Sequence, residues 1–121
     1  MMGSRQGKVW GTTQLSFRLN GIEAHLISVK QGGYCSLHYH HTKWNRFLVV
    51  SGQLRVTVRS EDMEDITVLN PGDITDIPPL VNHWFEALED CQAVEFYWCE
   101  LDPNDIERND DQLGGLRSNG T

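Results

Sequence analysis

The chain has 121 residues, the size of a single domain that buries its own hydrophobic core. Its hydrophobic content of 39%, charged content of 22% and net charge of −7 leave no Lys/Arg cluster for a phosphate backbone, so we expect no nucleic-acid partner. No run approaches the ~18 apolar residues that span a bilayer, so we expect no membrane partner either.

The first elements are expected to be strands, after a start over residues 1–7 that is disordered or in part an expression remnant. This start has no apolar segment typical of a secretory signal. The dipeptide Asn20-Gly21 is a strong hairpin-turn signal and precedes a predicted strand over residues 21–29. Residues 34–41 and 46–50 form the next two predicted strands.

Residues 54–58 alternate strictly between apolar and polar side chains, which predicts a strand with one buried face. The turn Asn70–Asp73 contains a proline, which presets φ, and a glycine, which accepts positive φ. Many short strands between Gly/Pro turns, with no long helix, indicate an all-β sandwich or closed barrel over residues 8–101. The remaining predicted strands are 66–69, 74–77, 83–88 and 93–98.

The C-terminal segment, residues 102–121, is polar and rich in Asp and Asn. It predicts a loose tail with a short helical turn after Pro103. The three cysteines, Cys35, Cys91 and Cys99, are an odd number without CxxC spacing, so we expect reduced thiols in a cytoplasmic protein. One of them could be a nucleophile, although buried structural cysteines are more common.

His38 and His40 are separated by one residue within a predicted strand. Side chains alternate along a strand, so both imidazoles project from the same face and can converge on one metal ion, while His41 points away. A metal with open positions needs three or four protein ligands, and Asn45 and His83 are the further candidates. The alternative is that the pair arises by chance and that these histidines are hydrogen-bonded surface groups.

Two longer segments carry a family resemblance. Residues 32–52 resemble the first motif of the cupins, G(X)5HXH(X)3–4E(X)6G, with Asn45 where the motif has Glu. Residues 72–87 resemble the second motif, G(X)5PXG(X)2H(X)3N, with Leu80 and Ala87 in place of the second Gly and the Asn.

The cupin resemblance implies a double-stranded β-helix, a jelly-roll barrel with one divalent metal ion inside. Carried over to this chain, the ligands are His38, His40 and His83, with Asn45 in the fourth position. An amide oxygen is neutral and a weaker ligand than a carboxylate for a hard cation. Three imidazoles suit Zn, Ni, Fe or Mn, and a metal-free structural site is the alternative.

A narrower resemblance is to the cupin domain of type II mannose-6-phosphate isomerase. It rests on Val9-Trp10-Gly11, Ser36-Leu37, residues 49–52 and residues 105–108. The family's usual Gln-x-His pair is His38-Tyr39-His40 here, and its Glu is again Asn45.

Glu95 and Tyr97 share one face of the last predicted strand. If that face lines the cavity, either residue can act as a general base or acid. The alternative is that Tyr97 packs in the core and Glu95 faces solvent. The basic residues near the barrel that could meet a phosphate or carboxylate are Lys30, Lys43, Arg46, Arg55 and Arg59.

These features together predict a metal-binding enzyme that acts on a small carbohydrate-like substrate, a sugar or sugar phosphate, by isomerase-type chemistry. Two alternatives stay open: an Fe(II)-dependent dioxygenase, and a non-catalytic cupin that binds or senses a small ligand. Long edge strands and exposed aromatic residues further predict a homodimer.

Overall fold

A computed structural model describes residues 5–99 and residue 104, which contain strands and no helix. The all-β class expected from the sequence is confirmed. The strands are β1 (Arg5–Lys8), β2 (Gly11–Leu19), β3 (Ile22–Val29), β4 (Trp44–Ser51), β5 (Leu54–Ser60), β6 (Met63–Leu69), β7 (Ile74–Ile77), β8 (Asn82–Ala87) and β9 (Cys91–Trp98). The predicted tail and its helical turn lie outside the described residues, apart from Asn104. Within the described part, no helix is long and apolar enough to cross a bilayer.

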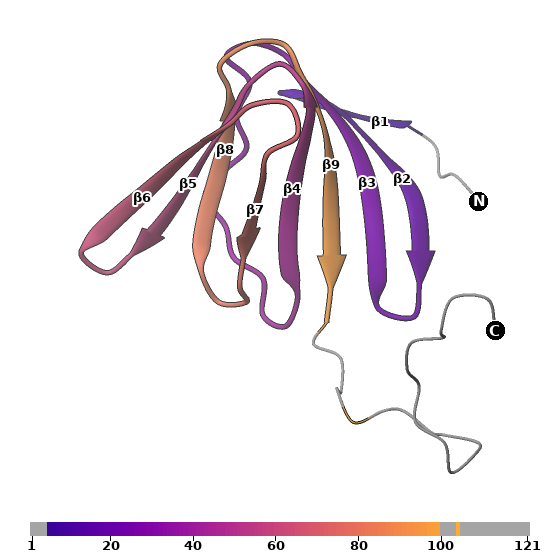
Figure 1. Ribbon diagram of the computed structural model, residues 1–121, viewed down its shortest axis with the longest axis vertical. Coiled ribbons are helices and arrows are strands. Elements are labelled where there is room, and N and C mark those ends of the chain that lie inside the picture. Colours follow the sequence, from indigo (N-terminus) through magenta and orange to yellow (C-terminus); the bar gives the residue numbers. More distant parts are fainter. Residues whose placement is uncertain (1–4, 100–103, 105–121) are drawn as a thin grey trace, which may run out of the picture.

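Two antiparallel sheets face each other (Figure 1). The larger sheet has the order β1-β2-β3-β9-β4-β7, and the smaller has the order β6-β5-β8. Because β9, the last strand, inserts between β3 and β4, residues distant in sequence become neighbours on one inner face.

The tight turns follow the sequence signals. Asn20 and Gly21 have φ values of 44° and 84°, the left-handed pair that a two-residue hairpin between β2 and β3 requires. Gly72 has φ 89°, and the Asp73 amide donates to the Asn70 carbonyl at 2.9 Å.

The strand predicted over residues 34–41 is not a regular strand. The segment makes two isolated bridges to β8, Tyr34 with Glu86 and His38 with His83. The register shifts by one residue between these bridges, which interrupts the ladder in the manner of a bulge. The extended backbone nevertheless keeps His38 and His40 close to β8.

The first two strands differ from the sequence expectation. β1 begins at Arg5, inside the range 1–7 expected to be a disordered start, and pairs with β2. β2 was not predicted, because no face of it is fully buried beyond Gly11 and its apolar alternation is weak.

The core fills one end of the space between the sheets. Inward positions of β4 are Asn45, Phe47 and Val49, and those of β8 include His83 and Phe85. Each strand therefore changes from apolar to polar inward residues at the same end, which is the lower end in Figure 1, where the β9 arrow finishes. Polar side chains are thus gathered at one open end of an otherwise apolar interior.

Candidate metal centre

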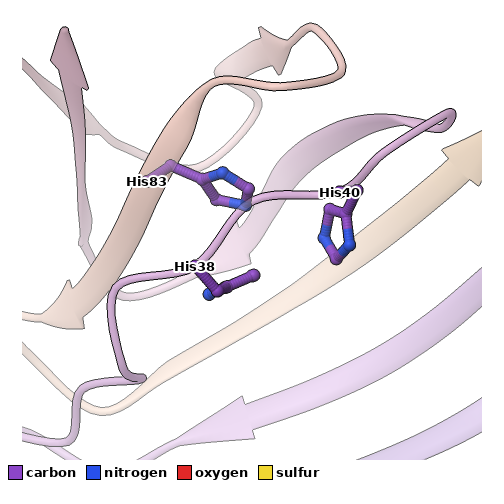
Figure 2. Close-up of side chains that lie close together, drawn as sticks. All are labelled: His38, His40 and His83. Carbon is purple, nitrogen blue, oxygen red and sulfur yellow. The ribbon is translucent and has the colours of Figure 1, made fainter.

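Three histidine side chains meet at the polar end. His38 and His40 come from the irregular segment beside β8, and His83 lies on β8 itself (Figure 2). Their ligand nitrogens all lie within 4.8 Å of one another. Two nitrogens bound at about 2.1 Å to one ion are at most about 4.2 Å apart, so an ion would draw the three rings slightly together.

Backbone contacts orient two of these rings. Nδ1 of His38 lies 2.7 Å from the Ser36 carbonyl oxygen, and Nδ1 of His83 lies 2.9 Å from the Val81 carbonyl oxygen. A carbonyl only accepts, so each Nδ1 carries the proton and each Nε2 presents a lone pair. Metal-ligating histidines commonly donate their other ring N–H to a carbonyl in this way.

The residues present fit a metal ion. Nε2 of His40 and Nε2 of His83 are buried and have no hydrogen-bond partner among the described residues. An unpaired buried nitrogen costs about 1–3 kcal/mol, and coordination would remove that cost for both atoms. Burial lowers the pKa of His40 to about 4 and also lowers the pKa of His83, so both rings are neutral at pH 7.

A cavity of about 540 Å³ opens beside the histidines. Glu95 and Tyr97 both line it, and Glu95 is only 9% exposed. The Tyr97 hydroxyl donates to Glu95 Oε2 at 2.7 Å. Burial raises the pKa of the Glu95 carboxyl and that of the Tyr97 phenol.

Other polar residues of the cavity were not found from the sequence. Glu23 Oε1 lies 2.9 Å from His25 Nε2, and Arg18 Nε donates to Glu23 Oε2 at 3.2 Å. The sequence did contain a signal for Glu23 and His25. Both lie an even number of residues from the buried Ile27 in the same strand, so all three side chains project from one face. Lys8 also lines the cavity.

The basic residues singled out from the sequence separate into two groups. Lys43 lines the cavity, with its Nζ 4.0 Å from the centre of the Tyr97 ring. Lys30 is exposed and outside the cavity lining. The others form ion pairs with carboxylates outside the cavity: Arg46 with Asp76, Arg55 with Glu86 and Arg59 with Glu64.

The cupin family model matches residues 3–116 of the chain. The chain belongs to the cupin family. Comparison with curated protein sequences gives no match.

Solved structures with a similar fold include three chains of different lengths. KdgF from Halomonas sp. is 21% identical with a TM-score of 0.70, over 82% of this cupin and 88% of KdgF. Oxalate decarboxylase from Bacillus subtilis is 19% identical with a TM-score of 0.71, over 81% of this cupin and 27% of the enzyme. The capsular polysaccharide assembling protein CapF from Staphylococcus aureus is 26% identical with a TM-score of 0.69, over 84% of this cupin and 32% of CapF.

This cupin therefore spans most of KdgF but only about a third of CapF and about a quarter of oxalate decarboxylase. The similarity confirms the jelly-roll fold. The Bacillus subtilis oxalate decarboxylase contains Mn(II) centres, so a metal site occurs in a protein of this fold.

Asn45 lies at the acidic position of the cupin motif and is fully buried on β4. Its Nδ2 donates to Glu95 Oε2 and to the Phe96 carbonyl, both at 3.3 Å. Its Oδ1 has no partner among the described residues. The side chain thus holds the buried carboxyl with its amino group and keeps an oxygen available.

The cysteines of this cupin are all free. Cys35 lines the cavity, and its sulfur accepts a hydrogen bond from the Phe85 amide at 3.3 Å. Burial raises the pKa of the Cys35 thiol to about 11, and that of the Cys91 thiol also to about 11. A protonated thiol is a poor nucleophile, so neither of these two residues suits nucleophilic catalysis at neutral pH.

Proposed function

We propose that this cupin is a metal-dependent enzyme that acts on a small polar carbohydrate-like substrate by isomerase-type chemistry. The observation that carries the proposal is that a free imidazole cluster and a buried carboxyl border the same cavity. His38 lines that cavity together with Glu95 and Tyr97. A purely ligand-binding pocket does not require a buried carboxyl there.

In this proposal His38, His40 and His83 hold one divalent ion, with Asn45 Oδ1 as the fourth protein ligand. The donor set suits Zn, Ni, Fe or Mn. When bound, the ion supplies a Lewis acid that polarises a carbonyl of the substrate. The backbone bonds of the His38 and His83 rings fix the direction in which they present their Nε2 atoms.

Glu95 is the proposed general base and acid. Both of its hydrogen bonds from described residues reach Oε2, and Oε1 receives none. Oε1 is therefore the atom proposed to take the proton from the carbon beside the carbonyl and to return it to the carbonyl carbon, while the proton of the adjacent hydroxyl moves to the carbonyl oxygen. Tyr97 lies beside Glu95 and is proposed to assist by donating a proton or hydrogen bond to a substrate oxygen.

Three further observations support a carbohydrate-like substrate. The segments around Trp10, Ser36 and residues 49–52 are similar to those of type II mannose-6-phosphate isomerase. CapF, at 26% identity, is a capsular polysaccharide assembling protein. Polar side chains of several kinds line the cavity, as recognition of hydroxyl groups requires.

The test is solvent hydrogen exchange into a sugar. The protein, loaded separately with Zn, Mn, Ni and Fe(II), is incubated in D2O with D-mannose 6-phosphate, D-fructose 6-phosphate and D-mannose. The C2 proton signal of the two mannose compounds and the C1 proton signals of D-fructose 6-phosphate are followed by NMR. We expect exchange that depends on the metal and falls by at least about 10²-fold in Glu95→Gln, the loss typical of a removed general base.

Two outcomes would contradict the isomerase-type assignment. Oxygen consumption by the Fe(II)-loaded protein without proton exchange would favour the dioxygenase. Saturable sugar binding with neither reaction would favour the ligand-binding cupin. Equal exchange by Glu95→Gln and the parent protein would remove Glu95 from its role.

In the same proposal the protein is cytoplasmic and forms a homodimer. Three free cysteines are compatible with a reducing compartment. The exposed apolar side chains Met63, Ile66 and Val68 on β6, an edge strand of the smaller sheet, are a surface that a second copy could cover.

A further inference from the structure

The charge of the cavity differs from the charge of the chain. The chain carries a net charge of −7 and has ten Lys and Arg residues. Three of these, Lys8, Arg18 and Lys43, line the one cavity beside the histidine cluster. They come from β1, from β2 and from the segment before β4, so the fold and not a local sequence run brings them together.

The charges of these three cations are less neutralised by carboxylates than those of the arginines on the outer surface. On the outer surface Arg46, Arg55 and Arg59 each have a carboxylate partner of their own. Lys8 and Lys43, in contrast, have no ion pair within the described residues.

The third cation is only partly compensated. Arg18 bonds Glu23 through Nε alone, and Glu23 also bonds His25, so one carboxylate is shared by two basic groups. The terminal amino groups of the Arg18 guanidinium make no hydrogen bond to a described residue.

The charged groups that line the cavity have a net positive charge, even when every carboxyl group is counted as ionised. Its lining contains two carboxyl groups, Glu23 and Glu95, against the three cations. Even with both carboxyls ionised, one positive charge is left over before any metal ion is counted. A concave site with a net positive charge raises the local concentration of anionic ligands.

Arg18 and the histidine cluster lie at opposite ends of one row of paired residues across the sheet. Lys8 is not part of this row, because it pairs with Gly11 at the other end of β2. The register pairs Arg18 with Glu23, Glu23 with Tyr97, and Tyr97 with Asn45. Four strands at about 4.8 Å spacing place the ends of this row about 14 Å apart along the backbone, and Arg18 extends back over it. Lys43 lies over the middle of the row, on the Tyr97 ring.

We propose that the cavity binds an organic anion, a polyhydroxy compound bearing a carboxylate or phosphate group, with that group held by Arg18 and Lys43 and its hydroxyls toward His38. This inference rests on the proposed function, because it specifies the charge of the same ligand. The guanidinium and ammonium groups supply the charge-assisted hydrogen bonds that such anions require. A volume of about 540 Å³ suits a ligand of sugar size.

The experiment is calorimetric titration of the metal-loaded protein with D-glucuronate, D-glucose 6-phosphate and uncharged D-glucose. We expect at least one of the two anions to bind ten times more tightly than D-glucose or better. Which of them does so separates a carboxylate from a phosphate ligand. Arg18→Gln and Lys43→Gln should each weaken binding of that anion about tenfold and leave D-glucose unchanged.

The matched control is Arg59→Gln, which removes a cation paired with Glu64 outside the cavity and should leave anion affinity unchanged. The inference would be overturned if neither anion bound more tightly than D-glucose. Unchanged anion affinity in both Arg18→Gln and Lys43→Gln would also overturn it, because the anion would then sit on the metal alone.

Metal content measured on every sample keeps the two proposals apart. A protein that holds its ion but shows no preference for anions contradicts this inference and does not contradict the metal centre. A protein that binds the anion through Arg18 without holding any ion contradicts the metal-dependent function instead.

Discussion

The backbone amides of His38 and His83 each donate a hydrogen bond to the carbonyl of the other, at 3.1 and 2.8 Å. This reciprocal pair joins two residues that are 45 positions apart and brings their ring centres to 4.3 Å. The histidine cluster is therefore organised by main-chain pairing before any ion binds, which lowers the ordering cost of coordination.

Metal binding should depend on the cluster and not on histidine content. We expect about one divalent ion per chain in protein purified without chelator, and loss of that ion in His83→Ala and His38→Ala. His41→Ala is the matched control, because His41 is exposed and lies outside the cluster. Elemental analysis of the four proteins is the measurement, and an ion retained by His83→Ala would contradict the site.

Removal of the ion should lower stability. A free ion at 100 times its Kd stabilises the folded state by about 2.7 kcal/mol, so chelator should lower the Tm of the parent protein. The Tm of His83→Ala should not respond to chelator. An equal response in both proteins would indicate that the ion binds elsewhere.

Asn45→Asp should change the stability of the metal-free protein and that of the metal-loaded protein in different ways. Without metal, the change removes the donor to Glu95 and places two carboxyls together in the interior, which should cost about 1–3 kcal/mol. With metal, an added negative ligand should strengthen coordination, so the ion should stabilise Asn45→Asp more than the parent.

Urea denaturation with and without the ion measures both effects for Asn45→Asp. Glu95→Gln in the same background should recover part of the metal-free loss, as a double-mutant cycle. If the ion stabilises Asn45→Asp and the parent equally, residue 45 is not a ligand.

The thiols should react in an order set by burial. At pH 8 iodoacetamide should modify the exposed Cys99 and leave Cys35 and Cys91 largely unmodified, since their pKa values of about 11 keep them protonated. Labelling of these two should rise about tenfold per pH unit below pH 11 for as long as the fold persists, since only the thiolate reacts. Mass spectrometry of the intact protein counts the adducts, and urea-unfolded protein should take up three.

Gly52 should tolerate alanine far less than Gly72 does. Both have positive φ, 78° and 89°, so both substitutions cost about 1–2 kcal/mol of backbone strain. A Cβ on Gly52 would also lie 2.0 Å from the Asp90 carbonyl oxygen, whereas one on Gly72 meets nothing within 4 Å. We expect a loss above about 3 kcal/mol for Gly52→Ala by urea denaturation. Equal losses for the two variants would contradict the close approach.

Local patterns in the sequence predicted much of the fold and the histidine cluster. The His38-Tyr39-His40 spacing puts two imidazoles on one side of any extended chain, and Asn20-Gly21 and Asn70–Asp73 contain the residues that their turns require. Short-range sterics decide such features. β2 was missed because its partly exposed faces carry no strong alternation.

Tertiary structure decided which faces meet. Alternation put Glu95 and Tyr97 on one face but could not say that it lines a cavity, and nothing local linked Arg18 or Glu23 to the histidines. The insertion of β9 between β3 and β4 and the one-residue shift beside β8 set these neighbours. Such pairings depend on contacts between segments that are distant in sequence. The entropy cost of closing the intervening loops, and the surface buried when the segments meet, cannot be read from a local pattern.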